Sequence, residues 1–247
     1  MNIKRFILFQ MTINLCACLI VLVGAFLGMD SPLTVTQMLW VNLIMDTFAA
    51  MALSSLPADR RVLNDYPRSS KSHIVDRVMV KRIFSVGLIF FVLLAALWQL
   101  MWHKEIHSVQ DILQPDTLKV LISDMFSMAR VKEHIGTREL SIFFSIFVML
   151  QFWNLFNAKY FKTNRSLIQD VIDLFHRPQV VREAHSKGFW MITLLILVGQ
   201  FLIVSYGGKM FSVERLTFAD WGWILLITSP VLIVADIYRY ISNLGNK

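Results

Sequence analysis

Six apolar stretches, each long enough to cross a lipid bilayer, are the feature that most constrains the fold of this chain. A helix needs about 17–25 predominantly apolar residues to span the hydrocarbon core. Only 17% of the 247 residues are charged, whereas a soluble domain carries about 25%. The sequence therefore predicts an all-α, polytopic membrane protein with six transmembrane helices. The predicted spans cover residues 6–28, 36–56, 83–102, 140–158, 189–207 and 221–238.

The distribution of basic residues predicts how these helices are oriented. An even number of spans places both termini on one side of the membrane. On that side, two Lys or Arg residues lie in 1–5, seven in 58–82, six in 159–187 and two after the last span, against seven on the other side. Cytoplasmic loops carry an excess of Lys and Arg, so both termini are expected in the cytoplasm. The net charge of +7 then reflects orientation and lipid headgroups, and no nucleic-acid partner is expected.

Motifs for soluble chemistry are missing from the 247 residues. The sequence has no phosphate-binding G-x-x-x-x-G-K-[ST], no dinucleotide-binding G-x-G-x-x-G and no zinc-ligand spacing. Each predicted cytoplasmic segment is under about 30 residues, which is too short to fold a nucleotide-binding domain alone. We therefore predict one transmembrane domain over residues 1–247, with no catalytic and no cofactor-binding residue. Pro230 is a lone break in the last span.

Asp46 is the acidic residue placed deepest within the apolar stretches. A carboxylate at membrane depth costs roughly 2.5–3.5 kcal/mol on insertion scales, so it is expected to have partners or to bind a cation. Asn42 lies four residues earlier, which on an α-helix places both side chains on one face. Asn14 lies in the middle of the first stretch. We predict Asp46 as the main metal ligand, with Asn42 beside it and Asn14 as a further candidate.

These three side chains are too few for a complete cation site. Calcium takes six to eight oxygen ligands, so backbone carbonyls or another helix would have to supply the rest. The fourth stretch carries Gln151, Asn154 and Asn157. Their simplest interpretation is hydrogen bonding between helices. Cys16 and Cys18 lie two residues apart in the first stretch, where they point in different directions and are interpreted as packing residues.

The residues around Asp46 resemble a known family. The segment 30–49, with DSPL at its start and QMLWVNLIMDTFA at its end, is similar to the sixth membrane helix of P-type calcium ATPases, most closely the plasma-membrane type. The segment 5–14 (RFILFQMTIN) resembles their fifth helix and 147–158 their eighth. The run 207–212 (GGKMFS), with Trp221, resembles the loop between the ninth and tenth helices. The resemblance covers essentially the whole chain.

The resemblance implies a single calcium site. In that family, the residues matching Asn42 and Asp46 coordinate the transported calcium. The intracellular-store type has a second site, and the corresponding positions here hold Ala17, Met45 and Gln151. Asn14 matches an asparagine of that second site.

The resemblance also implies that a larger part of the pump is missing. The phosphorylated aspartate, the nucleotide-binding and actuator domains and the first four helices precede the fifth helix in the family, and this sequence has no counterpart of them. The chain is thus expected to be a pump fragment or the product of a split or truncated gene. Its partners would be the lipid bilayer and the missing N-terminal pump portion. Calcium, or another divalent ion such as manganese, would be transported, while ATP and Mg²⁺ would act only through the missing domains. The short tail favours a bacterial inner membrane.

Two alternatives from other classes remain open at this point. A standalone six-span cation channel or ion-coupled transporter would use Asp46 as its ion site and would conduct without ATP. A non-transporting membrane scaffold would need Asp46 only for assembly.

Overall fold

The computed structural model describes residues 2–28, 31–57, 74–124, 132, 134–163, 165–176 and 186–245. Within these ranges the regular structure is entirely helical, and six helices are long and apolar enough to cross a membrane, which confirms the predicted fold class. The six are Asn2–Phe26, Val35–Ser54, Arg77–His103, Thr137–Lys159, Lys187–Tyr206 and Phe218–Ile237. Many of the basic residues used to predict orientation, in 58–73, 177–185 and at Lys247, lie outside the described residues.

The second and sixth spans are each made of more than one helix. The second consists of α2 (Val35–Leu39), a π-helical segment (Trp40–Met45) and α3 (Asp46–Ser54). The sixth is broken at the predicted proline, because α11 ends at Thr228 and α12 begins at Pro230. The other helices are α1 (Asn2–Phe26), α4 (Arg77–His103), a 3₁₀ turn (Val109–Leu113), α5 (Pro115–Asp124), α6 (Thr137–Lys159), α7 (Leu167–His176), α9 (Lys187–Tyr206), α10 (Gly208–Phe211), α11 (Phe218–Thr228) and α12 (Pro230–Gly245).

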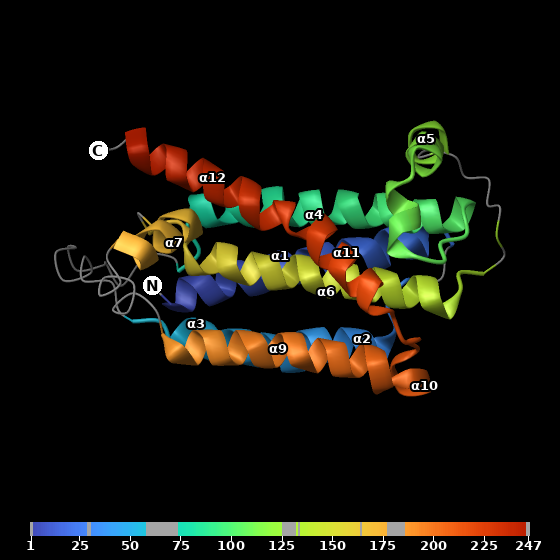
Figure 1. The fold of residues 1–247 in the computed structure, drawn as a ribbon, viewed down its shortest axis with the longest axis horizontal. Coiled ribbons are helices and arrows are strands. Elements are labelled where there is room, and N and C mark those ends of the chain that lie inside the picture. The colour runs from blue at the N-terminus through green and yellow to red at the C-terminus, as the bar shows by residue number, and fades with distance from the viewer. Residues whose placement is uncertain are drawn as a thin grey trace.

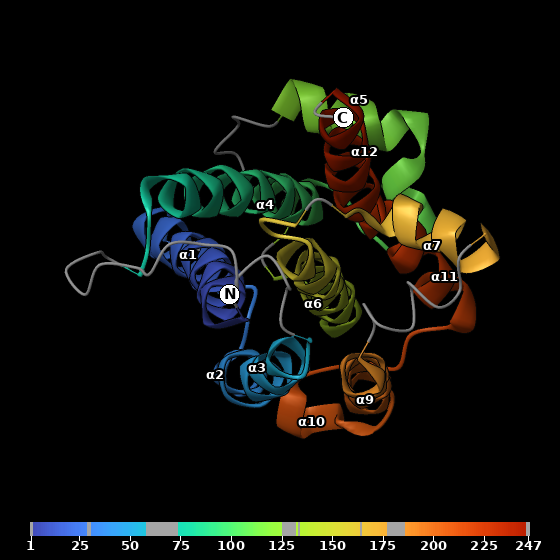
Figure 2. The same cartoon turned by 90° about the vertical axis from the view of Figure 1, so that its left-hand side faces the viewer.

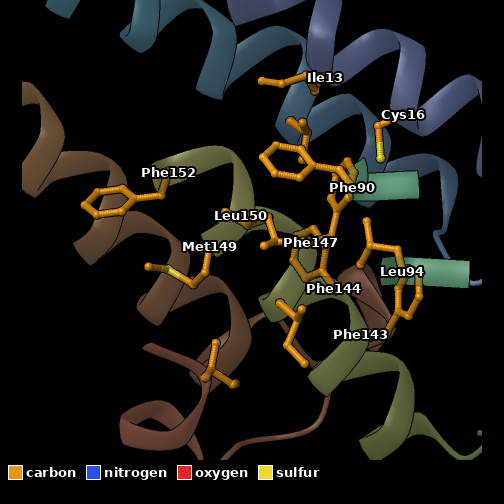
Figure 3. Packing of buried hydrophobic residues seen from close by; sticks show 14 of the residues in the cluster. Ile13, Cys16, Phe90, Leu94, Phe143, Phe144, Phe147, Met149, Leu150 and Phe152 are labelled. Carbon is orange, nitrogen blue, oxygen red and sulfur yellow. The ribbon is translucent and has the colours of Figure 1, made fainter. Parts of the chain in front are cut away.

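Helix α6 is the centre of the bundle. Of its most apolar stretch, 89% is buried, against 28–39% for the other five spans, and the end-on view shows those spans surrounding it (Figure 2). Its aromatic residues, among them Phe143 and Phe147, pack with residues of α1 and α4 such as Cys16 and Phe90 (Figure 3). The outer helices leave large apolar side chains exposed, as expected of helices that face lipid.

Helix α1 begins and α12 ends at the same end of the bundle (Figure 1), which we call the terminal end; the opposite end is the far end. At the terminal end, Asp236 of α12 accepts hydrogen bonds of 2.7 Å from the backbone N–H groups of both Leu167 and Ile168 at the start of α7. Arg239 donates to the Asn157 side-chain oxygen at 2.6 Å, and burial lowers the pKa of Arg239 to about 10. The last span, α6 and α7 are therefore joined by buried polar contacts.

Asp76 joins three further segments at the terminal end. Its carboxylate accepts the Met79 N–H at 2.9 Å, which caps α4. It also pairs with Lys162 at 2.6 Å and with Lys4 at 3.2 Å. The hydrogen bond from Lys162, followed by that from Met79, holds the pKa of Asp76 well below its usual range.

Replacing Asp76 with alanine is expected to lower the free energy of unfolding by about 1–2 kcal/mol at pH 7, because the cap is worth about 1 kcal/mol and partly exposed ion pairs add little. Since the folded-state pKa is depressed, this contribution is present above the unfolded pKa of about 3.9 and is lost as the pH falls toward the folded value. Asp76→Asn, which keeps a capping oxygen but loses the charge, is the control. Thermal unfolding in detergent measures both; equal melting temperatures for the alanine variant and the native chain would contradict this role.

At the far end, the connection between α4 and α6 is fixed by two buried carboxylates. Glu139 accepts the Ile106 N–H at 2.8 Å and pairs with Lys132 at 2.6 Å. Asp220, at the start of α11, pairs with Arg138 at 2.8 Å and accepts the Val109 N–H at 3.2 Å. The loop therefore lies against the spans as part of the folded structure.

Candidate cation site

Asp46 is buried inside the bundle, and the described residues hold no group that neutralises it. It opens α3, and 4% of it is exposed. Both carboxylate oxygens are buried, and neither accepts a hydrogen bond of normal geometry from the described part of the chain. The side chain of Gln10 on α1, which packs against α3, is a polar group that approaches the carboxylate. Burying a charge without a partner costs free energy in a protein interior. This burial is therefore consistent with a residue whose partner is a bound ion.

The backbone before Asp46 is wound as a π-helix. Trp40–Met45 form this segment, and the N–H of Asp46 returns to the carbonyls of Leu43 and Val41. The turn between Asn42 and Asp46 is therefore closed by i to i+5 hydrogen bonds and not by the α-helical bonds expected from the sequence. The side chain of Asn42 is exposed, whereas that of Asp46 is buried. Single π-turns occur frequently at functional sites.

The antiparallel pairing of the first two spans sets the depth of the candidate residues. At the terminal end, the Asn2 side chain donates to the carbonyls of Ser54 and Leu56, at 3.4 and 2.9 Å. Eight residues further along each span, about 12 Å at 1.5 Å per residue, lie Gln10 and Asp46. Twelve residues along lie Asn14, which is half-buried, and Asn42, which lies in the π-helical segment. The predicted residues are thus brought to neighbouring levels in the middle of the bundle.

Gln10 was not singled out from the sequence, and Gln151 was interpreted from it as a residue that hydrogen-bonds between helices. A glutamine in an apolar stretch was the available signal for Gln10. Gln151 of α6 is completely buried, and neither its oxygen nor its nitrogen has a hydrogen-bond partner in the described part of the chain. Gln151 lies one turn from Phe147 on the same face of α6, and Phe147 packs toward α1 (Figure 3).

The interhelical hydrogen bonding predicted for the fourth span is found at Asn157. Its side-chain nitrogen donates to the carbonyl of Val231 at 3.2 Å, and its oxygen accepts from Arg239. The side-chain nitrogen of Asn154, in contrast, is buried without a partner among the described residues. The two cysteines are free, with Cys16 buried and Cys18 exposed.

A cation held here would depend on amide and carbonyl oxygens as well as Asp46. Among the described residues, no three His, Cys, Asp or Glu side chains gather in a way that could hold a metal ion. Turned toward one ion, the Asp46 carboxylate and the amide oxygens of Gln10, Asn14 and Asn42 would supply a hard, oxygen-only donor set, which is the chemistry that calcium prefers. The set is smaller than the six to eight ligands that calcium takes, so further oxygens have to come from elsewhere.

Comparison with known proteins finds similar sequences among cation-transporting ATPases. Residues 30–241 match the family described as "Cation transporting ATPase, C-terminus". The chain is 29% identical over 232 residues to the plasma membrane calcium-transporting ATPase 4 of Bos taurus, covering 92% of this chain and 16% of the relative. Against the plasma membrane calcium-transporting ATPase 1 of Gallus gallus, identity is 30% over 233 residues, or 94% and 17% of the two chains.

A third relative is the plasma membrane calcium-transporting ATPase 2 of Oreochromis mossambicus, 29% identical over 246 residues, or 98% of this chain and 19% of the relative. The chain thus spans less than a fifth of the length of these relatives. All three come from vertebrates, so they give no support to the expectation of a bacterial inner membrane.

Proposed function

The chain belongs to the cation-transporting ATPase family by its match to the C-terminal region of these proteins, and from this premise we propose that it is the ion-translocating membrane part of an ATP-driven calcium pump. The observation that carries the proposal is Asp46, a buried carboxylate in the middle of the bundle with no neutralising group on the described residues. The proposed cargo follows from the oxygen-only donor set and from the calcium-transporting relatives. In this proposal the chain lies in the plasma membrane, and its terminal end faces the cytoplasm.

The exposed side chain of Asn42 supports a missing protein partner. A polar amide on a transmembrane helix seldom faces lipid, and such groups turn toward the interior of a helix bundle. Asn42 is exposed here beside the buried Asp46. We therefore propose that the face carrying Asn42 is covered in the intact pump by the portion that precedes the matched region, which would also supply the missing oxygen ligands. The described chain holds the charged ligand, and its partner completes the site.

The proposed mechanism is an alternation between two affinities. A pump moves an ion against its gradient when the same site binds tightly from one side and weakly from the other, which is a difference in affinity between two conformations. Asp46 would supply the charge attraction in both states. Asn14 and Asn42 lie on separate helices. Their side-chain oxygens would stop coordinating the ion when α1 and the π-helical segment move apart. ATP and Mg²⁺ would act through the preceding portion of the pump.

Calcium uptake by sealed vesicles tests this function. Vesicles that contain the chain together with the phosphorylating portion of the pump are expected to accumulate radiolabelled calcium when ATP is added, and neither component alone should do so. Calcium flux through the purified chain without ATP would instead favour a channel. No flux under either condition, with an assembled complex, would favour a scaffold.

Replacing Asn42 with alanine is expected to raise the calcium concentration for half-maximal uptake about tenfold, which corresponds to 1.4 kcal/mol and to the loss of one neutral oxygen ligand. Thr47→Val is the matched control. Thr47 is also exposed in the second span, but its hydroxyl is already bonded to the Leu43 carbonyl. An unchanged calcium dependence in the Asn42 variant would remove this residue from the site.

A further inference from the structure

Helix α9 runs beside the whole second span (Figure 1). At the terminal end it packs along α3, and the Ser186 hydroxyl donates to that of Ser55 at 3.1 Å. At the far end, the buried side chain of Gln37 in α2 donates to the Phe211 carbonyl at 2.8 Å. Both ends of the second span are therefore attached to α9 or to the turn that follows it.

Between these attachments, Trp40 is held by Gln200 of α9. The indole N–H of Trp40 donates to the Gln200 side-chain oxygen at 3.2 Å, and 1% of Gln200 is exposed. The neighbouring Gly199 lets the indole ring approach closely, since a Cβ added at Gly199 would lie 3.2 Å from a ring carbon. Two adjacent residues of α9 thus fix both the position and the polar edge of one tryptophan.

Trp40 is the first residue of the π-helical segment, and Asp46 follows its last residue. A π-turn is a local change of winding within a helix, so the way its first residue is held decides how the next residues are turned. Asn42 is the second residue after Trp40. The contact between Gln200 and Trp40 is therefore placed to control how Asn42 is oriented relative to Asp46, although α9 contributes no ligand.

We propose that Gln200 is a positioning residue for the cation site, which acts through Trp40 to hold the winding of the π-helical segment and, with it, the position of Asn42 relative to Asp46. The inference rests on the proposed calcium-transport function. The side-chain nitrogen of Gln200 is buried and has no partner in the described part of the chain, so the amide has a donor free for a second contact when the segment rewinds during transport.

The test uses Gln200→Met, which keeps the volume and removes the acceptor, in the intact pump. A single hydrogen bond to a neutral group corresponds to a change in affinity of about 2- to 10-fold. We expect the calcium concentration for half-maximal uptake to rise by that factor while the maximal rate stays within about twofold. Trp40→Phe should give the same shift, and the double variant should add nothing to either single variant, because the two residues act through one contact.

Ser186→Ala is the matched control, because it removes a different hydrogen bond between α9 and the second span and should leave the calcium dependence unchanged. A fall in melting temperature for Gln200→Met without a shift in calcium dependence, or additive effects in the double variant, would overturn the positioning role. Asp46→Asn, measured in the same vesicles, separates the two levels of proposal. If the native complex takes up no calcium, the proposed function fails. If Asp46→Asn leaves uptake intact, the assignment of Asp46 fails; if it abolishes uptake while Gln200→Met and Trp40→Phe change nothing, only the inference fails.

Discussion

Replacing Asp46 with asparagine is expected to abolish ATP-driven calcium uptake at the calcium concentration that gives half-maximal uptake by the native pump. The substitution keeps the size and one oxygen of the side chain but removes its charge. Two unit charges 4 Å apart interact by about 4 kcal/mol at an effective dielectric constant of 20, and the value doubles for a divalent ion. If half of this is offset by desolvation, the loss of affinity is still about a thousandfold.

The same substitution should leave the fold intact or stabilise it. Without a bound ion, the carboxylate is buried with no neutralising group on the described residues, and a neutral amide is less expensive to bury than a charge. A melting temperature equal to or above that of the native chain, together with lost uptake, is therefore the expected signature. Asp46→Glu should keep part of the activity because it keeps the charge, and Asp116→Asn, at an exposed position, should change neither quantity. Normal uptake by the Asp46→Asn pump would exclude the carboxylate as the main ligand.

The class of fold and the break in the last span followed from the sequence. The lengths of the apolar stretches determine the number of spans, and Pro230 breaks the last one because it cannot donate a backbone hydrogen bond. The position of Asp46 in such a stretch is enough to mark it as costly. Nothing in the local sequence distinguishes α6 as the central helix, because its burial depends on how all six spans pack.

The geometry around Asp46 required the structure. Six residues are too few for the hydrophobic pattern of a π-helix to differ visibly from that of an α-helix, so the winding of Trp40–Met45 could not be anticipated. The approach of Gln10 to Asp46 depends on the register between two antiparallel spans, which the contact of Asn2 with Ser54 and Leu56 sets. Register of this kind arises from tertiary contacts and has no signal in either helix alone.

Replacing Asp220 with alanine is expected to produce the largest loss of stability among the changes considered. Its side chain is completely buried at the far end. It pairs with Arg138 at 2.8 Å, accepts the Ser108 hydroxyl and the Val109 N–H at 3.1 and 3.2 Å, and accepts the Thr217 hydroxyl at 2.7 Å. Removing one member of a buried ion pair costs about 3–5 kcal/mol; because Arg138 is 28% exposed and also donates to the His107 carbonyl, we expect a loss at the lower end of this range.

For a chain of this length, a loss of this size lowers the melting temperature by on the order of 10 °C, which thermal unfolding in detergent would show. Glu214→Gln is the matched control, since this acidic residue is exposed in the connection that leads to the same helix. A change of less than about 1 kcal/mol in the Asp220 variant would mean that the far-end network adds little beyond a surface ion pair. The calcium dependence of the protein that remains folded should be native, because Asp220 lies at the far end of its span while Asp46 lies mid-bundle. Asp220 and Asp46 are thus expected to have opposite effects: removing the Asp220 charge lowers the stability and spares ion binding, and removing the Asp46 charge spares the fold and ends transport.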